Sequence, residues 1–261
     1  MKHLRLFLIP SALLFFPVSI FVFFCGSGKP PLTVIPQIVA TIPHDSTAFT
    51  QGLFFDSNRL YESEGLYGKS ALRILDAQNG DPIKHVTLDP RYFGEGCAKM
   101  EKTIVLITWR EQAALTYSLA DLSPGSTLVY CGEGWGLTSD RKGFFYMSDG
   151  SDTLTVRNKN FTIVRKIPVT SGGRAVKNLN ELEYVNSTIF ANVWYSDSIL
   201  EINPKTGRVE RIVDCSEVVK KEQPSSSDCV LNGIAYNPSN GRFFLTGKKW
   251  KNIFVVEIPG R

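Results

Sequence analysis

Five copies of a short pattern hold the residues of this chain that are best suited to chemistry. Each copy starts with a polar residue or a tryptophan, usually has glycine next, and continues into an apolar-rich strand. The leading residues are Gln51, Glu95, Trp135, Asn180 and Asn232, at intervals of 44, 40, 45 and 52 residues. A carboxylate grouped with amides and an indole could move protons and bind a polar ligand.

A second column of side chains follows each copy at the end of the next strand. Its members align within one residue of each other: Trp109, Asp149, Trp194 and Lys248, with Glu64-Gly65 in the first copy. The residues of both columns differ between copies, whereas their apolar flanks stay alike. This asymmetry favours a ligand site with directional chemistry. The alternative is a water-filled channel lined by assorted polar groups.

The elements that position these columns are short strands separated by turn signals such as Asn79-Gly80-Asp81-Pro82. Units of roughly 40 to 50 residues with several short strands are typical of propeller blades. We therefore predict an all-β fold, a five-bladed β-propeller. The last unit ends after its third strand, so the spare strand Pro36–Pro43 is expected to close the ring on the last blade, which removes an open edge. A β-sandwich with accidental regularity is the alternative.

Composition excludes several classes of function. The 261 residues are 43% apolar and 21% charged, as in an ordinary globular protein, and the net charge of +4 predicts no nucleic-acid partner. One of the three histidines is His3, so a multi-histidine catalytic metal centre is not expected, and His44 and His85 are assigned structural roles. The segments Gly65–Ser70 and Gly132–Gly136 resemble a phosphate loop and a dinucleotide fingerprint. The first lacks the leading glycine, and in the second Trp135 would obstruct the backbone.

The N-terminus forms a separate segment. Lys2 and Arg5 precede Leu6–Phe24, which contains no charged residue. We expect residues 1–28 to be a signal peptide or an N-terminal membrane anchor and residues 29–261 to be the propeller domain. This places the protein in the secretory pathway, extracellular or in the periplasm or lumen, with a membrane contact only through an uncleaved segment.

An oxidising compartment permits disulfides and glycosylation. Cys215 and Cys229 flank a polar stretch interpreted as a surface loop, and a disulfide between them is expected. Cys97 and Cys131 form the leftover pair or are two buried thiols. Asn160 and Asn186 head glycosylation sequons that are usable in a eukaryotic host.

Several segments resemble the plant and bacterial type of glutaminyl-peptide cyclotransferases, which are five-bladed propellers. They are PHDSTAFTQGL, LYESEGLYGKSALR, YFGEGCA, TWREQ, GWGLTSD, SDGSDTL, LNELEYVNSTIFANVWYSDSI, VLNGIAY and FLTGKKW, and they extend from about Pro43 to Trp250. The resemblance implies an acyltransferase that converts the N-terminal glutamine of peptides or proteins to pyroglutamate and releases ammonia. It also implies that no catalytic zinc is required.

The resemblance supports a site made of Phe49, Gln51, Glu95, Trp109, Trp135, Asn180, Trp194 and Lys248. Glu95 is expected to act as acid and base, with Asn180 and Lys248 stabilising the amide oxygen. Gln51 and Asn232 would hold the first peptide group or the amine, and the aromatic residues would wall the slot and exclude water. Asn232 and Asp149 rest mainly on the column argument. In GKKW, either Lys248 or Lys249 could face the site, and alignment with Trp109 and Trp194 favours Lys248.

Other functions remain open at this stage. A non-catalytic propeller could bind peptides or glycans through the same aromatic funnel, and Glu95 could merely pair with Lys248. A five-bladed glycoside hydrolase would need two carboxylates, for which Glu95 and Asp149 are available. No cofactor is expected, although backbone carbonyls in the central channel could hold a structural metal ion. No apolar surface stripe indicates an obligate partner, so a monomer is expected.

Overall fold

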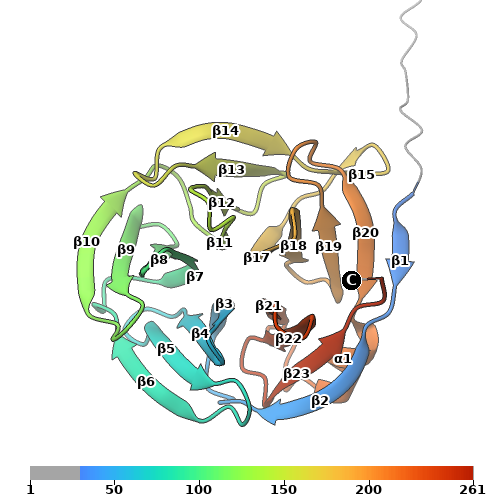
Figure 1. Cartoon of the computed structure of the whole chain (residues 1–261), viewed down its shortest axis with the longest axis horizontal. Coiled ribbons are helices and arrows are strands. Elements are labelled where there is room, and N and C mark those ends of the chain that lie inside the picture. Colours follow the sequence, from blue (N-terminus) through green and yellow to red (C-terminus); the bar gives the residue numbers. More distant parts are fainter. Residues whose placement is uncertain (1–29, 261) are drawn as a thin grey trace, which may run out of the picture.

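Antiparallel sheets repeat around a central axis in the computed structural model, which describes residues 30–260 (Figure 1). Each sheet is a blade whose first strand lies nearest the axis. Blade one consists of β3 (Thr50–Asp56), β4 (Arg59–Glu64), β5 (Ala71–Asp76) and β6 (Pro82–Thr87). Blade two consists of β7 (Gly94–Met100), β8 (Thr103–Thr108), β9 (Ala113–Ser118) and β10 (Pro124–Val129). Blade three consists of β11 (Leu137–Ser139), β12 (Phe145–Met147), β13 (Thr153–Arg157) and β14 (Ile163–Pro168).

The fourth and fifth blades complete the ring. Blade four consists of β17 (Leu179–Val185), β18 (Thr188–Val193), β19 (Ser198–Ile202) and β20 (Val209–Asp214). Blade five consists of β21 (Leu231–Asn237), β22 (Arg242–Gly247), β23 (Asn252–Glu257) and β2 (Gln37–Pro43). A short hairpin of β15 (Thr170–Ser171) and β16 (Arg174–Ala175) lies between blades three and four. The all-β, five-bladed architecture expected from the repeat is confirmed.

The ring closes where the N-terminal strand meets the last blade. Strand β2 pairs antiparallel with β23, with Gln37 opposite Glu257 and Pro43 opposite Asn252. This confirms the closure predicted for Pro36–Pro43. One addition was not predicted: β1 (Leu32–Val34) pairs in parallel with β20, so the chain that enters blade five first adds an outer strand to blade four (Figure 1).

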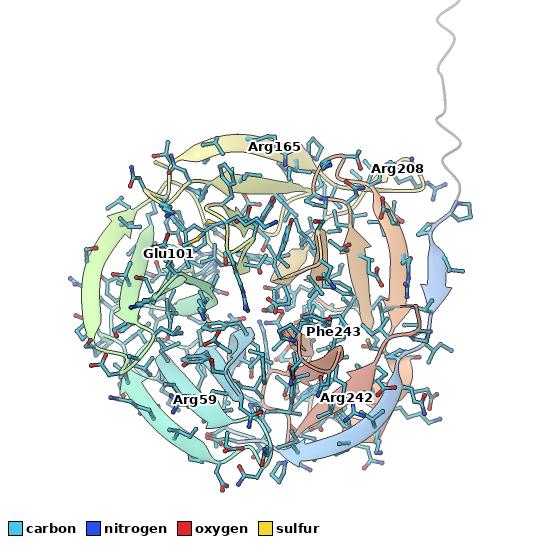
Figure 2. All side chains as sticks on the ribbon, in the orientation of Figure 1. Arg59, Glu101, Arg165, Arg208, Arg242 and Phe243 are labelled. Atoms are coloured by element: carbon cyan, nitrogen blue, oxygen red, sulfur yellow. The ribbon has the colours of Figure 1, made fainter. Side chains whose placement is uncertain are left out.

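The hydrophobic core lies between neighbouring blades. Strands β3, β7 and β21 are buried along nearly their whole length, whereas the outermost strands β6, β10 and β14 are mostly exposed. The aromatic pair Phe55 and Phe244 stacks at 5.7 Å across the junction of blades one and five. Figure 2 shows side chains filling the spaces between blades, with Arg165 and Arg208 at the periphery. Because the innermost strands have neighbours on both faces, their residues are buried without alternation.

The segment between Cys215 and Cys229 differs from the expected surface loop. It contains the helix α1 (Ser216–Glu222), which buries Val218 and Glu222. The Glu222 carboxylate accepts hydrogen bonds from Lys251 N at 2.6 Å and from Asn252 Nδ2 at 2.8 Å. The segment therefore packs on the last blade because its buried acid satisfies backbone and amide donors there.

The expected Cys215–Cys229 disulfide is not formed, and both residues are buried free thiols. The Cys215 sulfur lies 3.8 Å from Val213 O, while the Cys229 sulfur contacts the hydroxyls of Ser225 and Ser226 at 3.4 and 3.3 Å. Cys97 is a buried free thiol and Cys131 an exposed one, so these two are not paired either.

The predicted signal peptide or anchor at residues 1–28 lies outside the described residues. Within residues 30–260, no helix is long and apolar enough to cross a membrane. Both sequon asparagines, Asn160 and Asn186, are exposed between consecutive strands of a blade. Their glycosylation stays a prediction.

Candidate active site

The repeat residues reach the centre of the ring because the innermost hairpins are irregular at that point. The register between the first and second strand shifts in four blades, between Thr50 and Gly52, Gly94 and Cys97, Leu179 and Leu182, and Leu231 and Ile234. A β-bulge re-aims the side chain that it displaces. The residues inside these irregularities include Gln51, Glu95, Asn180 and Asn232, which explains why the pattern recurs.

The glycine after each leading residue is required by close contact between blades. A Cβ at Gly96 would lie 2.3 Å from Leu137 N, and one at Gly136 would lie 1.9 Å from Asn180 O. Glu181 occupies this place in blade four, where its carboxylate accepts hydrogen bonds from Leu53 N and Ile234 N at 3.3 and 2.9 Å. The one copy without glycine therefore places a carboxylate against two other innermost strands.

The second column is held by a shared backbone hydrogen bond. In four blades, its N–H donates to the carbonyl two residues before the leading residue. The bonds are Gly65 N to Phe49 O (2.9 Å), Trp109 N to Phe93 O (3.0 Å), Trp194 N to Asn178 O (2.8 Å) and Lys248 N to Val230 O (2.9 Å). This common geometry places Lys248, and not Lys249, in register with Trp109 and Trp194.

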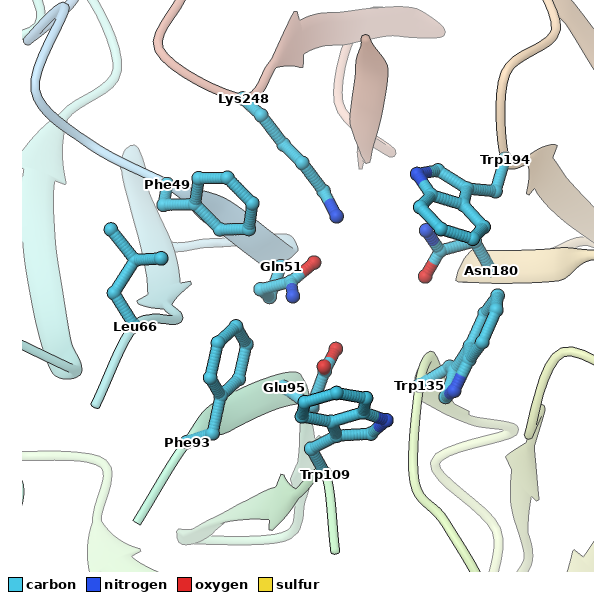
Figure 3. A pocket seen from close by; sticks show the side chains of 10 residues that line it. All are labelled: Phe49, Gln51, Leu66, Phe93, Glu95, Trp109, Trp135, Asn180, Trp194 and Lys248. Carbon is cyan, nitrogen blue, oxygen red and sulfur yellow. The ribbon is translucent and has the colours of Figure 1, made fainter. Parts of the chain in front are cut away.

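The two columns enclose a cavity of about 250 Å³ (Figure 3). Its lining contains eight residues predicted from sequence: Phe49, Gln51, Glu95, Trp109, Trp135, Asn180, Trp194 and Lys248. Leu66 and Phe93 complete it. The volume lies just below the range of roughly 300–1,000 Å³ typical of drug-sized ligands, so it suits a single amino-acid residue.

Aromatic rings form a continuous wall. Phe49 packs edge-on against Phe93 at 6.2 Å, and Phe93 packs against Trp109 at 5.5 Å. Trp135 and Trp194 form a second edge-on pair at 5.4 Å and 89°. Such contacts fix ring orientation as well as burying apolar area. The wall presents an apolar slot of defined width.

One carboxylate, Glu133, joins the two halves of this wall. Its Oε2 accepts hydrogen bonds from Trp109 Nε1 at 2.9 Å and Trp135 Nε1 at 3.2 Å, and its Oε1 accepts one from Arg110 Nε at 3.2 Å. The Arg110 guanidinium also stacks on Trp109, 3.6 Å from the ring centroid. Burial alone would raise the pKa of Glu133, but these three donors lower it, so the residue is an anion at neutral pH.

The polar end groups of Glu95, Asn180 and Lys248 point into the cavity, Glu95 and Lys248 from opposite sides (Figure 3). Glu95 is 5% exposed and Lys248 is 6% exposed. None of these three end groups hydrogen-bonds another residue in the range 30–260, although the Lys248 ammonium lies 4.6 Å from the centroid of the Phe49 ring. Buried polar groups without protein partners are expected where a ligand supplies them.

Burial changes the acidity of both charged groups. Desolvation raises the pKa of Glu95 well above its usual value, the charges of Glu133 and Glu111 raise it further, and Lys248 opposes them. Desolvation lowers the pKa of Lys248, and Glu95 opposes that change. A raised pKa makes a carboxylate a stronger base, which favours a role in acid–base catalysis.

Asn232 and Asp149 lie elsewhere. Asn232 is fully buried, and its Nδ2 donates to Thr50 O at 3.0 Å and to Gln51 Oε1 at 3.3 Å, so it contacts Gln51 and does not line the cavity. Because the Gln51 oxygen accepts this bond, the Gln51 NH₂ group is left to donate to a ligand. Asp149 is exposed and accepts a bond from Ser151 N at 3.0 Å.

Sequence reasoning missed Phe93, Leu66 and Glu133. The signal for two of them was present, because Phe93 and Glu133 stand two residues before Glu95 and Trp135, as Phe49 stands before Gln51. Leu66 had no such signal. It adopts a left-handed backbone conformation, with φ of 89°, that nothing in the local sequence indicates.

A buried ionic network supports the first blade of the site. His44 Nε2 lies 3.0 Å from Glu62 Oε1, and Thr50, the neighbour of Gln51, donates its hydroxyl to the same oxygen at 2.6 Å. Arg73 pairs with Glu62 Oε2 at 2.7 Å and with Glu64 Oε1 at 2.6 Å. His44 is structural in this arrangement, as predicted, and exposed His85 lies on β6.

Among residues 30–260, no group of three or more His, Cys, Asp or Glu side chains is arranged to hold a metal ion.

Comparison with known proteins identifies relatives over most of the chain. The family model described as glutamine cyclotransferase matches residues 25–258. A glutaminyl-peptide cyclotransferase of Arabidopsis thaliana is 38% identical over 228 residues, covering 85% of this chain and 71% of that protein. The crystal structure of the Myxococcus xanthus glutaminyl cyclase superposes with a TM-score of 0.82 at 35% identity, covering 87% of this chain and 98% of that structure.

Proposed function

The chain belongs to the glutamine cyclotransferase family of enzymes, and from that premise we propose that it converts the N-terminal glutamine of peptides or proteins to pyroglutamate without a catalytic metal. The observation that carries the proposal is the set of three end groups, on Glu95, Asn180 and Lys248, that face the cavity without partners among the described residues. A carboxyl, an amide and an ammonium group suit an amide substrate.

The reaction needs little covalent assistance, because the α-amine attacks the side-chain carboxamide carbon of its own residue. A bond forms between the amine nitrogen and that carbon, and the bond from that carbon to the amide nitrogen breaks. The amine loses one proton and the departing nitrogen gains one, so that ammonia leaves. One acid–base group between the two nitrogens is enough.

Glu95 is assigned this proton transfer. Its carboxylate takes the proton from the attacking amine, and the resulting carboxyl group gives it to the departing nitrogen. The raised pKa suits the first step, since it makes the Glu95 carboxylate a stronger base towards the attacking amine, and the carboxyl group so formed is the acid for the second step. Desolvation is the largest cause of that raised pKa, so the closed, aromatic wall contributes directly to the chemistry.

Lys248 and Asn180 are assigned the amide oxygen, on which negative charge develops as the amine attacks. A pre-oriented ammonium and amide N–H stabilise such charge strongly in a site without bulk water. The Gln51 NH₂ group, oriented by Asn232, is assigned the peptide carbonyl or the amine at the mouth. The indoles pack on the methylene groups of glutamine and exclude the water that would hydrolyse the amide to glutamate.

The test measures ammonia release and peptide mass together, with a glutamine-initiated peptide and excess chelator. We expect ammonia and a peptide lighter by one ammonia, at a rate that the chelator leaves unchanged. Glu95→Gln should reduce kcat by about 10²- to 10⁴-fold while peptide binding persists. Glu101→Gln, a change at an exposed acid paired with Lys159, is the matched control.

Three results would contradict parts of this proposal. A rate lost to chelator and restored by zinc would overturn metal independence. Full activity of Glu95→Gln would remove its assigned role. Peptide binding without any ammonia would favour the non-catalytic binding propeller instead.

A further inference from the structure

A second, larger cleft adjoins the cavity on the side of blade one. Its volume is about 560 Å³, and it shares Leu66 with the cavity. Its walls come from the turn before β3, the end of β4 and the turn that follows it, strands β5 and β6, and the segment after β22. The side chains that matter here are Asp45, Glu64, Lys69, Arg73, His85 and Lys249.

The acids of this cleft already have a partner. Arg73 lies 2.9 Å from Asp45 Oδ2 and 2.6 Å from Glu64 Oε1, and its own side chain is only 8% exposed. Desolvation and the charge of Glu62 raise the pKa of Glu64 to about 7, although Arg73 opposes this change. The raised pKa further reduces the negative charge on Glu64. Arg73, which Glu62 shares with them, therefore offsets part of the negative charge that these two carboxylates present to a ligand.

The lysines of the cleft are unpaired. Lys69 and Lys249 are exposed, and neither forms an ion pair within residues 30–260. The surface that a ligand would meet is consequently cationic.

Lys249 connects this cleft with the cavity. Its backbone adopts φ of 58°, and its N–H donates to Ala48 O at 2.7 Å. The ammonium groups of Lys248 and Lys249 lie 4.6 and 5.8 Å from the centroid of the same ring, Phe49. Lys248 lines the cavity and Lys249 lines the cleft, so a chain that leaves the cavity beside Phe49 passes Lys249.

Leu66 lies where the two hollows meet, in a backbone conformation that costs free energy. A leucine at φ of 89° is disfavoured, and such residues concentrate at functional positions. Its carbonyl is held by Lys69 N at 3.0 Å and Ser70 N at 2.9 Å. The fold thus maintains an apolar side chain between cavity and cleft.

Elsewhere around the mouth, polar groups beside the lining residues bind each other. The pairs are Tyr67 Oη with Glu111 Oε1 at 2.7 Å, Arg110 Nε with Glu133 Oε1 at 3.2 Å, and Tyr195 Oη with Asp228 Oδ1 at 3.0 Å. The cleft beside Leu66 differs from these places because its cations are not neutralised.

We propose that this cleft is the binding subsite for the residues that follow the N-terminal glutamine, and that Lys69 and Lys249 there select a substrate with an acidic side chain at the second position. The inference rests on the proposed cyclisation of glutaminyl peptides. The peptide crosses Leu66 with its first residue in the cavity, and the carboxylate of the second residue meets the two ammonium groups.

We expect the charge of the second residue to have a modest effect on kcat/KM, because the two lysines are exposed. Each ion pair should change kcat/KM by about two- to fivefold. The subsite is remote from the reacting carbon and binds ground state and transition state alike, so the change should appear in KM, with kcat constant.

The experiment compares three peptides that are identical except for Glu, Gln or Lys after the N-terminal glutamine. For the wild-type enzyme at low salt, kcat/KM should fall in that order, and the differences should shrink at high salt. The double variant Lys69→Glu/Lys249→Glu should reverse the order. Lys166→Glu, on the exposed outer strand of blade three, makes a single charge reversal away from the cleft and should keep the wild-type order.

Failure of this inference differs from failure of the proposed function. Equal kcat/KM for the three peptides in the wild type, or an unchanged order in a folded double variant, would overturn the subsite while cyclisation stands. If no peptide is cyclised, calorimetry tests the subsite by itself: the peptide with Glu should bind most tightly and the peptide with Lys most weakly. If the double variant does not fold, the salt dependence of the wild-type order decides.

Discussion

The indoles of Trp109 and Trp135 donate to one and the same oxygen, Oε2 of Glu133. The two rings belong to consecutive blades, and their shared acceptor fixes the spacing between those blades at the mouth of the cavity. The same carboxylate raises the pKa of Glu95 through its charge. Glu133 therefore affects both the shape of the slot and the acidity of the proposed catalyst.

Replacing Glu133 by glutamine should separate these two effects. Loss of the charge lowers the pKa of Glu95, so the acidic limb of the pH profile of kcat/KM should move to lower pH. Glutamine keeps one carbonyl oxygen that can accept from both indoles, so the slot should hold its shape and KM should change little. Steady-state kinetics between about pH 5 and 9 would measure both. Glu101→Gln removes an exposed charge elsewhere and should leave the profile unchanged; an unshifted profile in Glu133→Gln would contradict the electrostatic role.

The two adjacent lysines should behave differently when each is replaced by methionine. Lys248→Met removes the proposed oxyanion donor and should reduce kcat by about 10²- to 10³-fold. Lys249→Met should leave kcat unchanged and raise KM for a peptide with an acidic second residue. A large kcat loss in Lys249→Met, with little in Lys248→Met, would exchange the two assignments.

The contact at Gly96 should make a methyl group costly. In Gly96→Ala, the added Cβ meets backbone at 2.3 Å, which only a shift of two innermost strands can relieve. We expect a loss of roughly 2–4 kcal/mol in the free energy of unfolding, by analogy with severe overpacking. Gly241→Ala is the contrasting variant, since its φ of 74° strains an alanine backbone but its Cβ meets open space, whereas Gly96 has no left-handed φ. Urea unfolding should show the larger loss in Gly96→Ala, and a loss no larger than that of Gly241→Ala would contradict a dominant steric cost.

The buried network at His44 should limit stability on both sides of neutral pH. Burial would raise the pKa of Glu62, but His44 and Arg73 lower it to about 2, so its contribution is present above about pH 4.5 and is lost as pH falls towards 2. Burial would lower the pKa of His44, but Glu62 and the Trp250 carbonyl raise it above 6.5, so its contribution is lost as pH rises past that raised value. Glu64, with a pKa raised to about 7, lowers stability progressively as pH rises from about 4.5 to 7, because it is ionised in the unfolded chain while still protonated in the folded one.

Urea unfolding at a series of pH values should therefore show greatest stability near pH 4.5, a gradual decline towards about pH 7 from Glu64, and a further decline above about pH 6.5 from His44. His44→Gln should weaken the decline above pH 6.5. A decline of the same slope in that variant would assign the alkaline loss to other groups.

Much of the architecture follows from repetition that a single sequence contains. Five spaced copies predicted five blades, and the incomplete last copy predicted the closing strand β2. The leading column predicted Glu95 and Asn180 because a bulge accompanies that pattern in four of the five blades. These features are local or periodic, so pattern reading reaches them.

Other features depend on contacts that no local pattern records. Strand β1 pairs with β20 across a separation of almost 180 residues, and α1 packs because Glu222 meets Lys251 and Asn252. Asn232 shares the leading column but turns its amide to Gln51, since blades five and one adjoin there. Glu181 is the exception to the glycine pattern, and the role of its carboxylate could not be predicted without knowing which strands face it. Each depends on which blades are neighbours in space.

The pairing of β2 with β23 also has a consequence for how the protein is made. Strand β2 is among the first parts of the domain to leave the ribosome, yet its partner is among the last. Until synthesis is complete, the nascent ring has two open strand edges. Strands that are far apart in the sequence pair slowly, and during that time aggregation competes with folding. Residues on all five blades, with Lys248 the last to be added, line the cavity proposed to be catalytic or hold Gln51 in it. On that proposal, a chain that ends before Lys248 would lack catalysis as well as stability.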